Sequence, residues 1–370
     1  MPTKGPKIVT TTSLYDYIYG DYNSDGYDYI IDDFDTNQNI IKPLGTLFKQ
    51  IYDITSYLSF SINFFHLFIL TRKDLRTQNV YILMIGICVF DIFQAFANLV
   101  KNFMTWQIVY HEPECYDGYR YSHLVVDVVA KCLQIMSRRV SSFLVLYMAV
   151  FRALALIFPF NTKVNKLMNK KFSYLIMLFL IVICGAWSLI YSIFVRFKQN
   201  GFCPVRTSYL PYALVTDARN APWRRLYFVI DGYMSLFVSF SYILVAGALV
   251  VALRYAKRRR DSLGGPATPN NTSKLIMTMA ITVFISETVY GALYMWSYYT
   301  LYDYKDGKDF EKFDSFTLTL LIVNSTIHSI LCFFLSSQYR DTVLKLFSRR
   351  GNRVEPFNNR VDSSRHPISE

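Results

Sequence analysis

The chain has 370 residues, of which 52% are hydrophobic and only 18% charged, whereas an average soluble protein has about 25% charged residues. Such a chain cannot cover its apolar residues with polar surface, so an ordinary soluble protein, a disordered chain and a disulfide-stabilised miniprotein are excluded. The formal net charge of +12 is compatible with nucleic-acid binding, and the placement of the basic residues decides what that charge means.

Apolar segments of bilayer length, about 20 residues each, recur along the chain. The third of them holds Lys131, Arg138, Arg139 and Arg152, charges that are tolerated at membrane depth where they face the interior of a helix bundle. The alternative is a six-span protein in which this segment is a long amphipathic helix. We predict an all-α membrane protein, a bundle of seven transmembrane helices at 51–70, 80–99, 124–157, 172–194, 226–253, 275–298 and 316–335.

The basic residues are distributed unevenly between the two sides of the predicted membrane. The loops and tail on one side hold 20 Lys and Arg, whereas the loops on the other side hold 11 and the N-terminal tail adds 4. The positive-inside rule therefore predicts an extracellular N-terminus and a cytoplasmic C-terminus, in a multi-pass protein of the plasma membrane. The net charge is then largely a topology signal with affinity for acidic membrane lipids, and nucleic acid is not needed to explain it.

The N-terminal segment 1–47 is predicted to be an extracellular disordered tail. Its stretch 13–35 contains seven Asp and six Tyr, without Lys or Arg, and is too polar to fold alone. One interpretation is that this negative charge attracts a cationic ligand and raises the rate of encounter. The other is a solvated tail without a role.

Two of the six cysteines fall in predicted outer loops, which face an oxidising compartment. The simplest interpretation is a disulfide between Cys115 and Cys203. The other four, Cys88, Cys132, Cys184 and Cys332, lie within predicted spans, where a thiol usually packs as a small apolar side chain.

The third span ends with Phe151-Arg152-Ala153, and Pro159 follows. This resembles the Asp/Glu-Arg-Tyr…Pro motif of rhodopsin-like G-protein-coupled receptors, in which the Arg reaches the G protein when the cytoplasmic helix ends separate. The resemblance implies that Arg152 and Pro159 take part in coupling to a heterotrimeric G protein. Phe151 replaces the acid that holds this Arg in the inactive state, so the resemblance implies either raised basal activity or a substitute lock.

A second set of residues at mid-membrane resembles the sodium-binding cluster of the same receptors. The resemblance implies that Asp91 binds an allosteric sodium ion, with proton uptake as the alternative, and it implies no other cofactor. The residues of this cluster are Asn63, Asp91, Ser141, Asn324, Ser325 and His328.

The seventh span replaces the usual Asn-Pro-x-x-Tyr by His328-Ser-x-x-Cys332 and is followed by Ser336-Ser-Gln-Tyr-Arg340. This ending resembles the nematode serpentine receptors of class W and the related FMRFamide-type and myosuppressin-type neuropeptide receptors. Their Glu-x-Pro-x-Gly becomes Glu287-Thr-Val-Tyr-Gly291, so the kink-forming Pro of span six is missing. The resemblance also implies an amphipathic eighth helix. The chain is thereby divided into the tail 1–47, a receptor domain 48–336, the helix 337–348 and a cytoplasmic tail 349–370.

The register of this family bears on two features, the predicted disulfide and the residue that faces Arg138. The family's span-three cysteine falls at Asp127 here, farther along the chain than Cys115, and Cys132 is the alternative partner for Cys203. Arg138 lies about 21 Å outward from Arg152 along the helix, where the family's geometry places it opposite Glu287. We therefore expect Arg138 and Glu287 to pair at the floor of a ligand pocket, because an isolated buried charge is very costly. The expected rim consists of Asp127, Asp231, Tyr121 and Trp296.

The leading hypothesis is a receptor for a cationic, amidated, FMRFamide-like peptide, whose Arg and Phe side chains suit a pocket of carboxylates and aromatic rings. Its further expected partners are a heterotrimeric G protein, arrestin, a receptor kinase and membrane lipids. The main alternative is a chemosensory receptor for an environmental small molecule. A transporter or channel is a third hypothesis, although the two halves show no repeat. The chain shows no catalytic spacing of Ser, His and Asp, so an enzyme is not expected.

Overall fold

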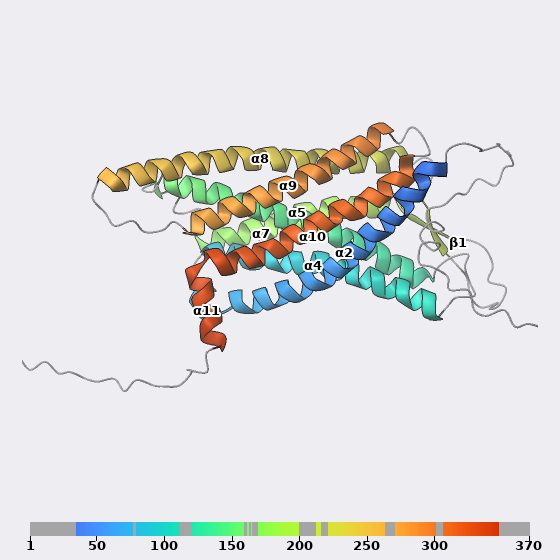
Figure 1. Cartoon of the computed structure of the whole chain (residues 1–370), viewed down its shortest axis with the longest axis horizontal. Coiled ribbons are helices and arrows are strands. Elements are labelled where there is room, and N and C mark those ends of the chain that lie inside the picture. Colours follow the sequence, from blue (N-terminus) through green and yellow to red (C-terminus); the bar gives the residue numbers. More distant parts are fainter. Residues whose placement is uncertain are drawn as a thin grey trace, which may run out of the picture.

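The computed structural model describes residues 35–76, 79–111, 120–158, 161–162, 164, 169–199, 212–215, 221–262, 271–300 and 306–347. Within these residues the chain is almost entirely helical, and its long helices form one bundle (Figure 1). The predicted all-α membrane fold is confirmed. The elements are α2 (Asp35–Leu70), α3 (Lys73–Arg76), α4 (Asn79–His111), α5 (Tyr121–Ile157), α7 (Lys170–Ile193), β1 (Arg196–Gln199), β2 (Tyr212–Val215), α8 (Ala221–Ser262), α9 (Asn271–Thr300), α10 (Asp306–Leu335) and α11 (Ser337–Phe347).

Six helices in the described part of the chain contain a stretch long and apolar enough to cross a membrane. These stretches are helical because a bilayer offers no hydrogen bonds to the backbone, which must satisfy itself within the segment. They are Asn79–Trp106, Tyr121–Ile157, Lys170–Ile193, Pro222–Tyr255, Met277–Trp296 and Asp314–Phe334. The basic third segment is among them, as predicted, and packs against α4, α7, α8 and α9 in the bundle.

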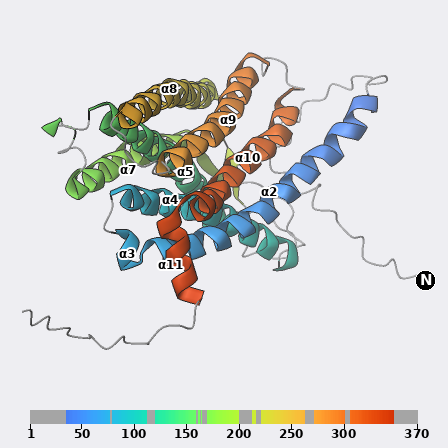
Figure 2. The same ribbon diagram turned by 60° about the vertical axis from the view of Figure 1, so that its left-hand side comes forward.

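The first predicted span, 51–70, is helical within α2 but is not among the six. Asn63 and His66 lower its hydropathy, and both are buried. α2 packs between α4 and α10 (Figure 2). This helix therefore occupies the position of a seventh span and hides its polar side chains on the face that contacts its neighbours.

Most helices extend beyond their predicted ends; α4 continues to His111 instead of ending at 99, and α10 begins at Asp306 instead of 316. α2 begins at Asp35, inside the segment predicted as a disordered tail, and α8 continues to Ser262 instead of ending at 253. α9 also begins slightly earlier, at Asn271. Extending an existing helix adds one hydrogen bond for each residue fixed. The polar residues next to a helical span therefore continue its helix. Residues 1–34 and 348–370 lie outside the described residues.

The two ends of the bundle carry different elements. Strands β1 and β2 pair antiparallel, with Arg196 opposite Val215, and lie at the end where α2 begins, here named the hairpin end. At the opposite end, the α11 end, α11 turns away from the direction of α10 (Figure 1). Tyr121, at the start of α5, contacts the rings of Phe197 and Tyr212 in the hairpin, with centroids 5.0 and 5.5 Å apart.

Helices α8 and α9 approach closely at two glycines. A Cβ atom on Gly291 would lie 2.8 Å from Cγ of Leu236 and 2.9 Å from the carbonyl oxygen of Gly232. Both helices run unbroken through this contact, in keeping with the missing kink proline of span six. Because no side chain separates the backbones, spans five and six are held together here as a pair.

Helix α11 is amphipathic, with Tyr339 and Val343 buried and Leu344 and Lys345 exposed. The Tyr339 hydroxyl lies 2.7 Å from Nδ1 of His66 on α2, and the Ser336 hydroxyl lies 2.8 Å from that of Tyr81 on α4. Burial raises the pKa of the Tyr339 phenol, so this hydroxyl stays protonated near neutral pH. These contacts attach α11 to two other helices.

Candidate ligand pocket and buried charge network

Two arginines of α5 and two carboxylates form a buried network at the centre of the bundle. Nη2 of Arg138 lies 2.5 Å from Oδ2 of Asp231, and Nη2 of Arg139 lies 2.7 Å from Oδ1 of the same carboxylate. Glu287 Oε2 lies 3.6 Å from Arg138 and 3.5 Å from Arg139. All four side chains are at most 4% exposed. Two positive and two negative charges balance within this network, as the low-dielectric interior requires.

Hydroxyl and indole groups complete the hydrogen bonding of the carboxylates. Ser142 and Ser235 each donate to Glu287. Asp231 accepts from the Tyr290 hydroxyl at 2.9 Å and from the Trp187 indole at 3.3 Å. The network thus joins α5, α7, α8 and α9, and a shift of any one of these helices would disturb bonds to the others.

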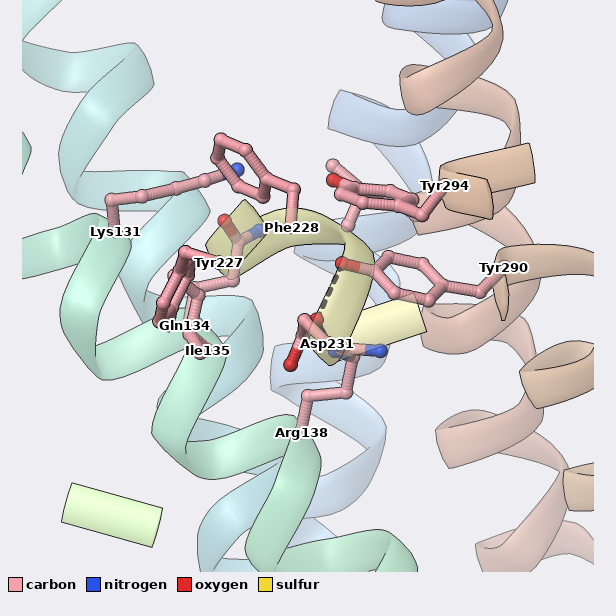
Figure 3. Close-up of a pocket in the computed structure, with 10 residues that line it drawn as sticks. Lys131, Gln134, Ile135, Arg138, Tyr227, Phe228, Asp231, Tyr290 and Tyr294 are labelled. Carbon is pink, nitrogen blue, oxygen red and sulfur yellow. Dashed lines mark hydrogen bonds and ion pairs between the residues drawn. The ribbon is translucent and has the colours of Figure 1, made fainter. Parts of the chain in front are cut away.

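A pocket lies directly beside this network (Figure 3). Its α5 residues Lys131 and Gln134 are nearer than Arg138 to the start of α5 at the hairpin end. Its cavity of about 10 Å³ has room for roughly one water molecule. Arg138 stands 3.7 Å from the centroid of the Tyr290 ring, which stacks on Tyr294 at 4.1 Å. The lining residues are Lys131, Gln134, Ile135, Arg138, Tyr227, Phe228, Asp231, Tyr290, Tyr294 and Leu318.

The structure brings Arg138 and Glu287 together as expected, but it changes the predicted rim. Asp231 is not a rim residue: it is 2% exposed and belongs to the charge network, because it is the carboxylate closest to both arginines. Asp127, Tyr121 and Trp296 do not line the pocket. Asp127 pairs with Lys101 at 3.2 Å, and Tyr121 packs on the hairpin. The side chain of Trp296 is 56% exposed.

Several lining residues were missed by the sequence analysis, although a signal for them was present. Lys131, Gln134 and Arg138 follow one another at intervals of three and four residues, which places them on one face of α5. Tyr290 and Tyr294 show the same spacing on α9. Arg139 lies next to this stripe and is fully buried. A polar and aromatic stripe of this kind on an apolar span indicates an inward face.

The mid-membrane cluster separates into two groups. In the first, the Ser141 hydroxyl donates to Oδ1 of Asp91 at 2.7 Å, and Nδ1 of His328 lies 3.8 Å from Oδ2. In the second, the Asn63 amide donates to Ser325 at 2.9 Å and its carbonyl accepts from Ser329 at 2.7 Å. The Asn324 carbonyl oxygen and both ring nitrogens of His328 have no hydrogen-bond partner in the described part of the chain.

The arrangement around Asp91 does not fit the sodium ion that the resemblance implies. Sodium is a hard cation and requires several converging oxygen ligands. One carboxylate oxygen of Asp91 is engaged by Ser141, and the other faces an imidazole nitrogen. Ser325 is turned toward Asn63.

The residues expected to contact a G protein lie at the α11 end. Arg152 is partly buried, and its Nε has no hydrogen-bond partner among the described residues. Phe151, which replaces the usual acid, is 5% exposed and packs on Tyr147 with ring centroids 5.6 Å apart. Pro159 lies outside the described residues.

The predicted disulfide also lies outside the described residues, which include neither Cys115 nor Cys203. Cys132, the alternative partner, is a free thiol and donates to the carbonyl of Ser188 at 3.4 Å. Cys88, Cys184 and Cys332 are free and buried, in line with their predicted role as small apolar side chains.

Comparison with known protein families places the chain in one of them. Residues 50–350 match the family model described as serpentine type 7TM GPCR chemoreceptor Srw. This range runs from the first helix through α11 and includes the charge network, the pocket and Arg152. Among curated proteins, no sequence matches the chain significantly.

Proposed function

We propose, for a chain that belongs to the serpentine 7TM chemoreceptor family Srw, that it binds a small external molecule in the pocket beside the Arg138–Glu287 network. Members of this family are G-protein-coupled receptors and not enzymes, so an extracellular ligand and a G protein are its partners. The observation that carries the proposal is the direct contact between the pocket and a charge network that joins four helices. A ligand there can act on all four at once.

The compactness of the pocket favours a small ligand. Its cavity of about 10 Å³ is filled by little more than a water molecule, whereas ligand sites commonly measure about 300–1,000 Å³. Binding therefore requires the lining side chains and helices to move apart. A ligand that binds the opened pocket better than the closed one shifts the population toward the opened state.

The charge network can transmit ligand binding from the pocket to the α11 end. Asp231 and Glu287 lie on α8 and α9, and both arginines lie on α5. Separating α9 from α5 lengthens the contacts of Glu287 with Arg138 and Arg139, and the close contact at Gly291 carries α8 along with α9. We infer that this movement exposes Arg152 to the G protein. The motion resembles a rigid-body shift of packed helices about a bistable interface.

The orientation in the membrane follows from the basic residues. We infer that the hairpin end is extracellular and the α11 end cytoplasmic, because the segments at the α11 end carry the excess of Lys and Arg. α11 then lies at the inner membrane surface, where Lys345 suits acidic lipids. Arrestin and a receptor kinase remain proposed partners of the C-terminal tail.

A cationic amidated peptide is the second candidate ligand, and the acidic tail favours it, with seven Asp in 13–35. The pocket offers such a peptide fewer free carboxylates than the sequence predicted. Both carboxylates that a ligand guanidinium would seek are already paired with Arg138 and Arg139. The peptide would have to displace these arginines, which is unfavourable for two buried cations.

The experiment is a screen of receptor-expressing cells with a promiscuous G protein, using small molecules in one arm and Arg-Phe-amide peptides in the other. We expect small molecules to activate, and Glu287→Gln to abolish the response while the receptor still reaches the cell surface. Lys101→Gln is the control, since Lys101 does not line the pocket. Activation by amidated peptides alone would replace this proposal by the second candidate.

A further inference from the structure

The carboxylates around the pocket have direct partners, whereas one of the cations does not. This difference indicates the charge that a ligand must carry. Each carboxylate has direct partners: Asp231 and Glu287 are held by the two arginines. Asp127 pairs with Lys101 at 3.2 Å, and Asp314 accepts from the Tyr294 hydroxyl at 2.8 Å. A ligand with a positive charge meets no free carboxylate among these.

Lys131 is the exception among the lining cations. Arg138 is paired, but Lys131 makes no ion pair or hydrogen bond with any described residue. Asp314 and Asp127 attract its ammonium, whereas Lys101 and Arg138 repel it, and none of the four is a direct partner. The side chain is partly buried and extends across the pocket toward Phe228 (Figure 3). The ammonium thus lies among apolar and aromatic lining residues and makes no direct contact with a carboxylate of the described residues.

A second lining residue is also unsatisfied. The hydroxyl of Tyr227 is buried and has no hydrogen-bond partner in the described part of the chain, and the residue is only 3% exposed. Its ring is fixed by stacking on Trp187, with centroids 4.7 Å apart and planes 16° apart. Buried hydroxyls are normally hydrogen-bonded, so an unpaired one in a pocket wall suits a group that arrives with the ligand.

We propose that the ligand of this receptor carries a carboxylate, which binds the Lys131 ammonium and accepts a hydrogen bond from Tyr227. The apolar or aromatic remainder of the ligand packs on Phe228, Tyr294 and Leu318. An ammonium and a hydroxyl are both donors, and a carboxylate is a pure acceptor that takes both. This inference rests on the proposed small-molecule function. It also disfavours an amidated peptide, whose C-terminal amide is neutral.

The test uses small aryl- and alkyl-substituted monocarboxylic acids, each with its methyl ester and primary amide. The readouts are activation of the full-length receptor in cells and thermal stabilisation of the purified receptor. We expect the acids to be active and the neutral analogues to be weaker by roughly 10- to 100-fold, the value of a hydrogen-bonded charge. Peptides with a free C-terminal carboxylate form a further arm, which distinguishes a peptide source of the same group.

Two variants separate recognition from folding. Lys131→Gln should remove the preference for acids over esters, and Lys131→Arg should retain it. Tyr227→Phe deletes one unpaired hydroxyl and keeps the stacked ring, so it should weaken acids without lowering stability. Lys101→Gln removes an equal charge outside the pocket lining, and Tyr191→Phe removes a hydroxyl from the same aromatic cluster. Both controls should keep the preference.

The outcomes separate this inference from the function on which it rests. Neutral or cationic small molecules that activate equally well in Lys131→Gln would overturn the carboxylate assignment and leave the small-molecule receptor intact. Activation by amidated peptides alone would overturn both.

Discussion

Arg139 and Asp231 make two direct contacts, an ion pair of 2.7 Å and a hydrogen bond from Nε of 2.9 Å, although Arg139 was not expected in the site. Arg139 also donates to the backbone carbonyl of Asp231. Consecutive residues of a helix point about 100° apart, yet Arg138 and Arg139 both reach this carboxylate because Asp231 faces the gap between them.

The first prediction concerns charge balance in this network. Glu287→Gln leaves two arginines against one carboxylate, and removing one partner of a buried pair costs about 3–5 kcal/mol. We expect a clear fall in the thermal stability of the purified receptor. The double variant Arg138→Met, Glu287→Gln restores one cation to one anion and should be more stable than Glu287→Gln alone. If the double variant loses the sum of the two single losses, the groups are not coupled.

The second prediction concerns the contact between spans five and six. A methyl group on Gly291 would meet Leu236 and the Gly232 carbonyl at under 3 Å, so Gly291→Ala should push α8 and α9 apart at a cost of about 1–3 kcal/mol. Gly247→Ala on the partner helix, α8, is the control, because nothing lies within 4 Å of its added methyl. That change should stabilise by about 0.5–1 kcal/mol. Equal effects of the two substitutions on the melting temperature would contradict the close approach.

The third prediction concerns Arg152. Its partly unpaired guanidinium suggests a group kept available for a partner. Arg152→Gln should lower affinity for the G protein roughly 10- to 100-fold, the value of hydrogen bonds to a charged group, while ligand-induced thermal stabilisation is retained. Arg340→Gln, an exposed change on α11, is the control for altered charge at this end. Loss of ligand stabilisation in Arg152→Gln would indicate misfolding, and unchanged coupling would exclude the assigned role.

The fourth prediction concerns sodium. An ion that binds only the folded state raises its stability with concentration. Because the imidazole of His328 faces Asp91 at 3.8 Å, we expect the melting temperature of the purified receptor to stay the same when sodium chloride is replaced by choline chloride. A rise with sodium that disappears in Asp91→Asn would show that the ion binds there after all.

Sequence reasoning reached the bundle and its family but placed the site residues incompletely. The spans were predictable because hydropathy over about 20 residues reports directly on membrane burial. The first span was harder, since Asn63 and His66 reduce its hydropathy, and only its neighbours α4 and α10 show that these groups are hidden. The pairing of Arg138 with Glu287 was accessible through the family's register. The position of Asp231 was not, because no periodicity within α8 reveals which residue of α5 it faces.

The sequence by itself determined that this protein is a membrane-embedded helical receptor of a serpentine family. Hydropathy and local motifs depend only on residues that are close together along the chain. Only the tertiary structure decided which charges neutralise one another. Ion pairs between Arg139 and Asp231 join residues 92 positions apart, and such contacts depend on how helices rotate and pack rather than on local spacing. The same packing satisfied the carboxylates and left Lys131 and Tyr227 without partners, which changed the expected ligand from a cation to a carboxylate.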